Sequence, residues 1–311
     1  MIDFSTLESL IIPEGVVSSI KDTSGKMLWR YIAPISLTVE KRTISTRAGE
    51  EACVLLDIYP KSANSVVRVT YEGYSKVLTF TDTNKKTVFF GTYLGETDPV
   101  STPSSGTLTI GGECLGFGSG RYSEKTSSTF VSTTSPCITG VSRWGEVEMI
   151  PDYAFMECTQ LALTSLPTTI TRIGDYAFMN CTQVKITIIP KNVTYIGDAA
   201  FYIVANGTTA ISSMLANLYL PANLLEIGAM AFPCYYYGGA TNGYKDYPRV
   251  INEIEIDAPT PPKMEVVGGT IGVFWDTSAN TRGRNIKVPK GCSAAYKSAP
   301  GWSLYADYIT E

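Results

Sequence analysis

The chain has 311 residues, of which 44% are hydrophobic and 17% are charged, and its formal net charge is −4. This composition is that of a globular protein of about two domains, and the mild acidity argues against a nucleic-acid partner because binding to phosphates requires a basic surface. The chain has no histidine, which excludes histidine-based catalytic and metal sites, and its apolar runs are too short for a membrane-spanning helix.

Residues 1–33 are interpreted as an anchoring leader. Two short apolar segments, 16–20 and 27–31, flank the turn-forming residues 22–26 and predict a small two-stranded unit. Such a unit is marginally stable alone, so we expect it to dock onto another protein. The start of the chain lacks the pattern of a secretory signal, so export by that route is not expected. The candidate anchoring residues are Ile20, Leu28, Trp29 and Tyr31.

Residues 34–112 have β-strand patterning throughout. The motif Tyr71-Glu-Gly-Tyr74 predicts a hairpin turn inside this region. Short strands at regular spacing, with turn residues between them, favour a β-sandwich. The six candidate strands are Ile35–Glu40, Ala52–Tyr59, Val66–Tyr71, Lys76–Phe80, Val88–Tyr93 and Gly106–Gly111.

Residues 113–137 are rich in glycine, serine and threonine. This composition predicts either a linker or the first cap of the domain that follows. The glycines between Gly116 and Gly120 also suggest a phosphate-binding loop, but no lysine–serine pair and no helix-opening pattern follow them. A phosphate loop is therefore disfavoured.

Residues 138 to about 250 repeat themselves. Four isoleucines stand 23, 23 and 31 residues apart (173−150, 196−173 and 227−196), and each is followed four residues later by an Ala-Phe pair. A period in the twenties with one longer step is typical of a solenoid that carries an insertion. The isoleucines are Ile150, Ile173, Ile196 and Ile227, and the pairs end at Phe155, Phe178, Phe201 and Phe232.

The repeated columns are predicted to be core. One copy cannot bury its own apolar face, so copies stack about 4.8 Å apart and equivalent side chains form ladders. Each copy is expected to supply a short strand that ends at a proline, as in 187–190 and 218–221. Gly174, Gly197 and Gly228, which follow the isoleucines, are expected to allow a bend that a Cβ would strain.

The pattern L-x-x-I-x-I-P-x-x-V-x-x-I-G-x-x-A-F-x-x-C resembles the BspA-like leucine-rich repeat. Residues 161–181 follow it almost fully, and the segments 254–262, 286–289 and 296–305 are similar to the C-terminal ending common in that family. Trp302 and Tyr305 are expected to pack in this C-terminal cap. The resemblance covers 138–311 and implies a curved repeat surface used for adhesion or recognition, without naming a ligand.

Two further resemblances concern the first part of the chain. Residues 17–29 are similar to leaders of structural proteins of tailed bacteriophages and prophages, and 34–112 resembles the immunoglobulin-like modules of phage and bacterial surface proteins. The predicted fold is therefore mainly β: a β leader (1–33), an Ig-like β-sandwich (34–112), a linker or cap (113–137) and a BspA-like leucine-rich repeat solenoid (138–311).

Few residues suggest chemistry. Glu253, Glu255 and Asp257 alternate with apolar residues, which places them on the outer face of one strand. A solvated face is the main interpretation, cation binding between copies is an alternative, and a glycosidase that uses only carboxylates is a remote one. The seven cysteines form no C-x-x-C pair and are expected to be buried free thiols. No catalytic, cofactor-binding or metal-binding residue is proposed.

A tyrosine-rich segment after the fourth Ala-Phe pair is the candidate recognition surface. Tyrosine with glycine and asparagine gives contact area at small entropic cost, as in antibody paratopes. Packing over the end of the solenoid, or against a neighbouring subunit, is the alternative. The candidate residues are Tyr235, Tyr236, Tyr237, Asn242, Tyr244 and Tyr247.

Together these features predict a non-enzymatic structural or adhesion protein of a tailed-phage virion, assembled in the host cytoplasm. Its leader is expected to contact other virion proteins, and its repeats a host-surface glycan or protein. A homo-oligomer is expected, and neither nucleic-acid binding nor membrane insertion is. The alternative is a BspA-like adhesin on a bacterial cell surface.

Overall fold

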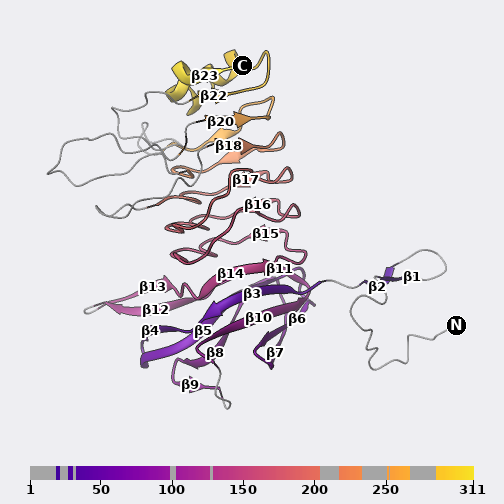
Figure 1. Cartoon of the computed structure of the whole chain (residues 1–311), viewed down its shortest axis with the longest axis vertical. Coiled ribbons are helices and arrows are strands. Elements are labelled where there is room, and N and C mark those ends of the chain that lie inside the picture. The colour runs from indigo at the N-terminus through magenta and orange to yellow at the C-terminus, as the bar shows by residue number, and fades with distance from the viewer. Residues whose placement is uncertain are drawn as a thin grey trace. The chain divides into compact units, whose positions relative to one another are not determined.

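The computed structural model describes residues 19–21, 27–30, 33–98, 103–126, 129–203, 217–232, 251, 253–266 and 285–311. The described chain is mainly β, as the sequence predicts, and it divides into a first unit of residues 1–33 and a second of residues 34–311 (Figure 1). In the first unit, β1 (Ser19–Lys21) pairs antiparallel with β2 (Met27–Arg30), so the two strands expected in the leader are present.

The second unit begins with two antiparallel sheets. The first has the order β14 (Ile138–Arg143), β3 (Ile35–Glu40), β10 (Ser105–Gly112), β6 (Val66–Tyr71) and β7 (Tyr74–Thr79). The second has the order β11 (Cys114–Ser119), β5 (Gly49–Pro60), β8 (Lys86–Tyr93) and β9 (Glu96–Thr97), with β4 (Arg42–Thr46) also paired to β5. The six predicted strands are all present. The sequence missed β4, β9 and β11, and it assigned residues 138–143 to the solenoid, whereas β14 pairs with β3 of the first sheet.

The two sheets face each other across an apolar core. Alternating residues of β3 are buried, and so are those of β6, because successive side chains of a strand point to opposite faces. The Tyr71 and Phe90 rings, one from each sheet, have centroids 5.5 Å apart. The predicted hairpin turn joins β6 to β7, with Glu72 and Gly73 both at positive φ, as a tight two-residue turn requires. The sandwich prediction is confirmed.

Residues 113–137 carry strands, where the sequence predicts a linker or a cap. β11 pairs with β5, and β12 (Arg121–Thr126) pairs with β13 (Thr129–Thr134). The glycines of β11 serve close packing: a Cβ on Gly118 would come within 2.5 Å of the Ala154 Cα, and one on Gly116 within 2.8 Å of the Met149 carbonyl oxygen. β11 therefore belongs to the sandwich and also covers the first repeat, while β12 and β13 form a two-stranded sheet of their own.

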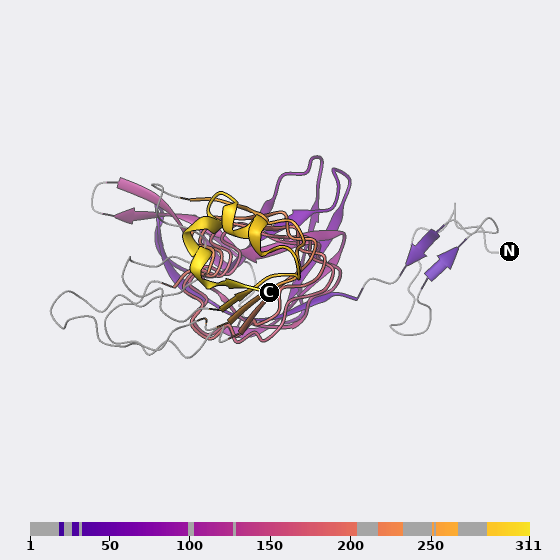
Figure 2. The ribbon, with the colours of Figure 1, turned by 90° about the horizontal axis from the view of Figure 1, so that it is seen from above.

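The solenoid follows as a stack of copies (Figures 1 and 2). Its first sheet is parallel and in register, with one two-residue strand from each copy. The isoleucines of four copies lie opposite one another, and Met264 continues their column in a fifth copy that the sequence analysis missed. The strands are β15 (Met149–Ile150), β16 (Arg172–Ile173), β17 (Tyr195–Ile196), β19 (Glu226–Ile227) and β21 (Lys263–Met264).

A second parallel sheet lies on another side of the later copies. It consists of β18 (Asn217–Leu220), β20 (Glu253–Ile256), β22 (Asn285–Lys287) and β23 (Ile309–Thr310). The prediction of a proline-ended strand in every copy is wrong. In 187–190 only Ile188 forms a bridge, to Tyr219, and 163–167 forms no strand. A segment forms a strand only where a neighbouring segment pairs with its backbone N–H and C=O groups. In this sheet regular pairing starts at β18, so the earlier copies lack the strand.

The repeated Ala-Phe pairs form the core column. Phe155, Phe178, Phe201 and Phe232 stack nearly parallel, with successive ring centroids 5.1, 5.2 and 5.4 Å apart. All four are buried, as predicted. Phe117 of β11 meets the first ring of the column edge-on at 5.8 Å. Most buried apolar residues of the sandwich and the solenoid consequently form one continuous cluster, whereas Ile44, Cys53 and Leu55 form a smaller second one.

The glycines Gly174, Gly197 and Gly228 recur in the repeat for a different reason from the one expected. Gly174, Gly197 and Gly228 do not have positive φ, so the backbone bend alone does not require glycine. A Cβ on Gly197 would lie 2.5 Å from the Asp175 backbone nitrogen of the preceding copy, and the other two glycines meet the equivalent atoms at 2.4 Å. Glycine is needed because successive copies approach one another too closely for a side chain.

The C-terminal segment closes the stack. It contains helix α1 (Ser293–Ser298) and the 3-10 helix η2 (Trp302–Tyr308). The Trp302 indole Nε1 donates to the Pro262 carbonyl oxygen at 2.8 Å, and the Tyr296 hydroxyl donates to that of Ala258 at 2.7 Å. Trp302 and Tyr305 are buried, which confirms their predicted role in the cap. Neither of these helices, nor any other in the described chain, is long and apolar enough to cross a membrane.

Candidate recognition surface

The tyrosine-rich candidates lie outside the described residues. This applies to Tyr235, Tyr236, Tyr237, Asn242, Tyr244 and Tyr247, and also to Tyr31 of the leader. The other anchoring candidates lie on the described hairpin, where Ile20 of β1 is the register partner of Trp29 of β2 and Leu28 precedes Trp29. The recognition and anchoring roles of these residues stay predictions.

The first solenoid sheet presents an outward row, one residue from each copy: Met149, Arg172, Tyr195, Glu226 and Lys263. Most of this row is already paired within itself. The Arg172 guanidinium lies 3.8 Å from the Tyr195 ring centroid, and the Lys263 Nζ lies 2.7 Å from a Glu226 oxygen. Groups that are satisfied by their neighbours have little capacity left for a ligand.

A column of aspartates beside this row is structural. Asp152, Asp175 and Asp198 each accept, through Oδ1, the backbone N–H at the equivalent position of the next copy, at 3.0, 3.1 and 2.7 Å. Burial raises the pKa of Asp198, while the hydrogen bond from the Ala229 N–H opposes that rise. These carboxylates hold the copies in phase, and the sequence signal for them is the Gly-Asp pair in the second and third copies.

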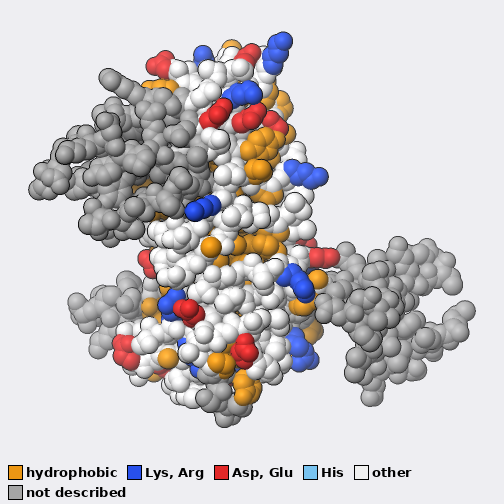
Figure 3. Space-filling view, in the orientation of Figure 1, with side chains coloured by type: hydrophobic (Ala, Val, Ile, Leu, Met, Phe, Trp, Pro, Cys, Tyr) orange, Lys and Arg blue, Asp and Glu red, His pale blue; other side chains and the backbone are white. Residues whose placement is uncertain are grey.

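The second solenoid sheet presents a different outward face. Glu253 and Glu255 of β20 are exposed while Ile254 and Ile256 are buried, so the predicted alternation is confirmed. The Glu255 carboxylate lies 3.2 Å from the Lys287 Nζ. Asp257 accepts the Tyr219 hydroxyl, and this hydrogen bond raises the pKa of Tyr219 to about 12. Acidic, basic and hydrophobic side chains gather over β18 and β20 in Figure 3.

This face is hollowed. A depression of about 370 Å³ lies over β18 and β20, within the size range of small-ligand sites. Its lining comes from three successive copies: Thr187, Ile188, Asn217, Leu218, Tyr219, Glu253 and Glu255. Within the described chain, the Glu253 carboxylate and the Asn217 amide have no hydrogen-bond partner. The sequence signal for this site was the acidic alternation, but the apolar and amide groups beside it are brought there by the stacking.

Catalytic and metal chemistry find little support at this face. Among the described residues, no group of three or more histidine, cysteine, aspartate or glutamate side chains is arranged to hold a metal ion. A glycosidase acid is kept protonated by an apolar environment, whereas Glu253, Glu255 and Asp257 are all exposed. The face is better suited to binding than to proton transfer.

The described cysteines are free thiols, as predicted. Cys53, Cys114, Cys137, Cys158 and Cys181 are buried, and Cys292 is half-buried; Cys234 lies outside the described residues. Burial raises the pKa of the Cys137 thiol to about 12 and that of Cys158 to about 11. Thiols of this kind remain protonated at neutral pH and are poor nucleophiles.

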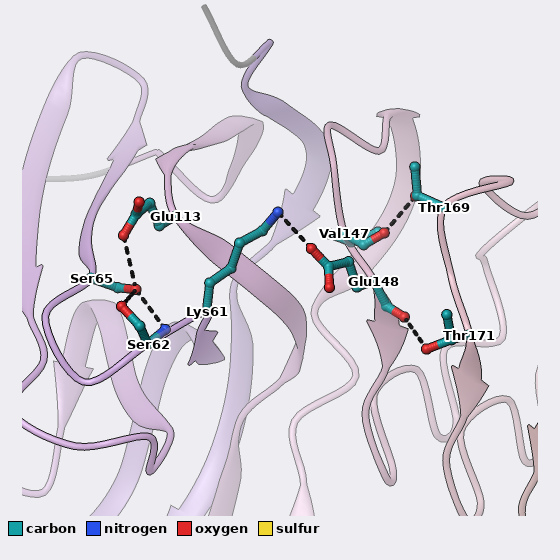
Figure 4. Close-up of polar contacts among 8 residues, drawn as sticks. All are labelled: Lys61, Ser62, Ser65, Glu113, Val147, Glu148, Thr169 and Thr171. Atoms are coloured by element: carbon teal, nitrogen blue, oxygen red, sulfur yellow. Dashed lines mark hydrogen bonds and ion pairs between the residues drawn. The ribbon is translucent and has the colours of Figure 1, made fainter. Parts of the chain in front are cut away.

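The junction of sandwich and solenoid fixes where the repeat surface begins (Figure 4). The Lys61 Nζ, next to β5, lies 2.8 Å from a carboxylate oxygen of Glu148, next to β15. The Glu148 carbonyl oxygen in turn accepts the Thr171 hydroxyl of the next copy at 3.2 Å. The Leu115 carbonyl oxygen of β11 accepts the Glu148 N–H at 2.9 Å, so the first copy is held by backbone as well as by side chains.

Comparison with known proteins finds a match for the repeats. A family model described as "BspA type Leucine rich repeat region (6 copies)" matches residues 148–237. These residues match a BspA-type leucine-rich repeat. Among solved structures, the chain is similar to a leucine-rich repeat protein from Bacteroides ovatus, with 18% identity and a TM-score of 0.26. That match covers 58% of this chain and 40% of the other. No curated protein matches.

Proposed function

We propose that this chain is a non-enzymatic attachment protein whose BspA-type repeats present a recognition face to a cell-surface ligand. The observation that carries the proposal is the outward face of β18 and β20, where a hollow is lined by polar and apolar side chains from three copies. Except for Leu218, which forms the apolar floor of the hollow, the lining side chains of β18 and β20 lie outside the core, because the buried residues of these strands point the other way.

The scaffold behind this face supports the proposal. β18, β20 and β22 pair in register, and the cap residue Tyr296 is hydrogen-bonded to the carbonyl oxygen of Ala258, just after β20. Because the strand backbone is already held in place, binding a ligand orders side chains but no loop, and this lowers the entropic cost of binding. Several copies of the chain on one particle would multiply such contacts.

The second part of the proposal concerns the particle or cell surface to which this chain is attached. We place the chain on a tailed-phage virion, as a head fibre, decoration or tail-associated protein, with residues 1–33 bound to other virion proteins. Two considerations support this: the resemblance inferred from residues 17–29 to leaders of phage structural proteins, and the division of the chain into a unit of residues 1–33 and a unit that contains the repeats. The alternative carrier is a bacterial cell surface, which the BspA-type repeat match favours.

The test separates attachment from anchoring. Purified full-length chain and a shortened chain that starts at Pro34 are compared for binding to fluorescent bacterial cells and for oligomeric state by light scattering. Binding by both proteins, stronger for the full-length protein, with an oligomer only in the full-length protein, supports both parts of the proposal. Absence of binding to any strain in a broad panel contradicts attachment, whereas two identical monomers contradict self-assembly through the leader.

A further inference from the structure

We propose that the hollow over β18 and β20 is a saccharide subsite that accepts a neutral or amino-bearing hexose and rejects anionic sugars. The inference rests on the proposed attachment function and names its site and ligand class. A hexose is amphipathic, with hydroxyls at its edge and C–H groups on its faces. It is bound where planar polar groups stand beside an apolar surface, and the hollow provides both.

The first feature of the hollow is a pair of neighbouring polar side chains. Asn217 of β18 and Glu253 of β20 are register partners in a parallel pair, so their outward side chains are neighbours. An amide and a carboxylate side by side offer one donor group and several acceptor sites, which suits two adjacent sugar hydroxyls. Both side chains are exposed, and neither has a hydrogen-bond partner among the described residues. The Thr187 side chain lines the same hollow.

The apolar surface is supplied by the preceding copy. Ile188 is 62% exposed, which is a large exposed fraction for an isoleucine, and it forms a bridge with Tyr219. Leu218 is buried beneath the hollow, and Tyr219 is half-buried in its wall. A sugar face laid against Ile188 and Tyr219 would remove this apolar area from water. The sequence alone does not explain why an isoleucine is left exposed at this position.

Charge decides the class of sugar. Glu253 and Glu255 both line the hollow, and the nearby cation, Lys287, is already paired to Glu255. A sialic acid or a uronic acid would bring a further carboxylate next to Glu253, and among the described residues no lysine or arginine lines the hollow to balance it. Juxtaposed like charges are a common way in which binding sites reject the wrong ligand. A neutral hexose has no such penalty, and a protonated amino sugar would pair with Glu253.

The experiment uses the full chain on an immobilised glycan panel. The panel contains oligosaccharides ending in galactose, N-acetylglucosamine, glucosamine, sialic acid and glucuronic acid. We expect binding to one or more of the first three and none to the last two. Asn217→Ala and Ile188→Ser are each expected to weaken the binding roughly tenfold or more. The first leaves a sugar hydroxyl without its hydrogen-bond partner, and the second removes the apolar surface on which the sugar face lies.

Matched variants separate the site from general surface effects. Leu225→Ser removes a side chain that is 68% exposed, comparable to Ile188, but that does not line the hollow. Glu226→Gln changes an outward carboxylate of the first sheet and serves as the control for Glu253→Gln. Both controls are expected to bind like the original chain, and thermal unfolding checks that every variant is folded. Relative to the original chain, Glu253→Gln is expected to weaken the binding of glucosamine more than the binding of galactose.

Two outcomes would overturn the inference. One is binding to sialylated or glucuronylated glycans that is equal to or stronger than binding to neutral ones. The other is attachment to cells that is unchanged in Asn217→Ala and Ile188→Ser, which would leave the proposed attachment function intact and move it to another surface. Absence of attachment in the unmodified chain contradicts the attachment function itself, so the two failures are distinguishable.

Discussion

In the sandwich, a buried side chain meets unrelated residues from distant parts of the sequence, as Tyr71 meets Phe90. In the solenoid it meets its own equivalent in the next copy, as Phe155 meets Phe178 and Phe178 meets Phe201. The first kind of core accepts different residues at every position, because each contact is unique. The second kind imposes one requirement on every copy, because each position faces its own repetition.

The space around the glycines shows the same difference between the two cores. In the solenoid, three equivalent glycines all face backbone atoms of the preceding copy. In the sandwich, Gly111 of β10 has no atom within 4 Å of the place where a Cβ would be, and its φ is not positive. A glycine inside a repeat is thus a packing requirement, while one inside the sandwich can be incidental.

The largest expected effect tests that contrast. Gly197→Ala should lower the free energy of unfolding by roughly 3 kcal/mol, because the new methyl group overlaps the backbone of the preceding copy and forces the copies apart. Urea denaturation followed by tryptophan fluorescence measures the change. Gly111→Ala is the control, with an expected change within about 0.5 kcal/mol. Similar losses in the two variants would show that the repeat imposes no special requirement.

The second largest effect on stability is expected at Glu51, whose carboxylate is hydrogen-bonded to a turn of the sandwich. Glu51 is buried and accepts the Leu94 N–H at 2.8 Å, the Gly95 N–H at 2.6 Å and the Thr46 hydroxyl at 2.6 Å. Burial raises the pKa of Glu51, but these three hydrogen bonds outweigh it and hold the pKa below the ordinary value of 4.5. Glu51→Gln should cost about 2 kcal/mol at neutral pH, because an amide cannot accept all three bonds.

The pH dependence of Glu51 has a definite sign. A carboxyl whose pKa is lowered by folding stabilises the protein above its ordinary pKa, and this contribution is lost as the pH falls through the lowered value. The unmodified chain should therefore lose more stability than Glu51→Gln when acidified from neutral pH to below 4.5, as measured by urea denaturation at each pH. Glu50→Gln, at the exposed neighbour, should keep the original slope. Parallel curves for Glu51→Gln and the unmodified chain would contradict the assignment.

The smallest effect concerns the contact between the two regions. Lys61→Met removes the ion pair with Glu148, whose side chains are 24% and 50% exposed, respectively. Partly exposed pairs contribute little, so we expect a loss of about 0.5 kcal/mol that disappears in about 1 M salt. Lys191→Met, at an exposed lysine of the solenoid, is the control. A loss of several kcal/mol would mean that this pair, and not the shared apolar core, holds the regions together.

The sequence predicted those parts of the fold that repeat or alternate. The isoleucine and phenylalanine columns were visible because one residue type recurred at one spacing, and the six sandwich strands because apolar residues alternated with polar ones. The fifth copy was missed because Met264-Glu265 stands where the earlier copies have Ile-Gly or Ile-Pro. The cover provided by β11 was missed because its glycines and serines are also typical of a linker, and only the packing against Ala154 shows their use.

The candidate site was predicted only in part. The outward position of Glu253 and Glu255 followed from strand alternation. The residues that surround them did not follow, because Ile188 and Asn217 are 29 residues apart in the chain (217−188) and line one hollow only because successive copies stack. A periodic pattern tells which residues face outward, but pairing across copies decides which of them share a hollow.

The register of the first solenoid sheet has a consequence for how this protein can change. Its paired strands are separated by 23, 23, 31 and 37 residues (173−150, 196−173, 227−196 and 264−227), yet each pair is aligned residue by residue. The number of residues between strands is therefore free to vary, while their alignment is not. Insertions between strands can supply new binding chemistry during evolution, and the ladder that carries them needs no compensating substitutions.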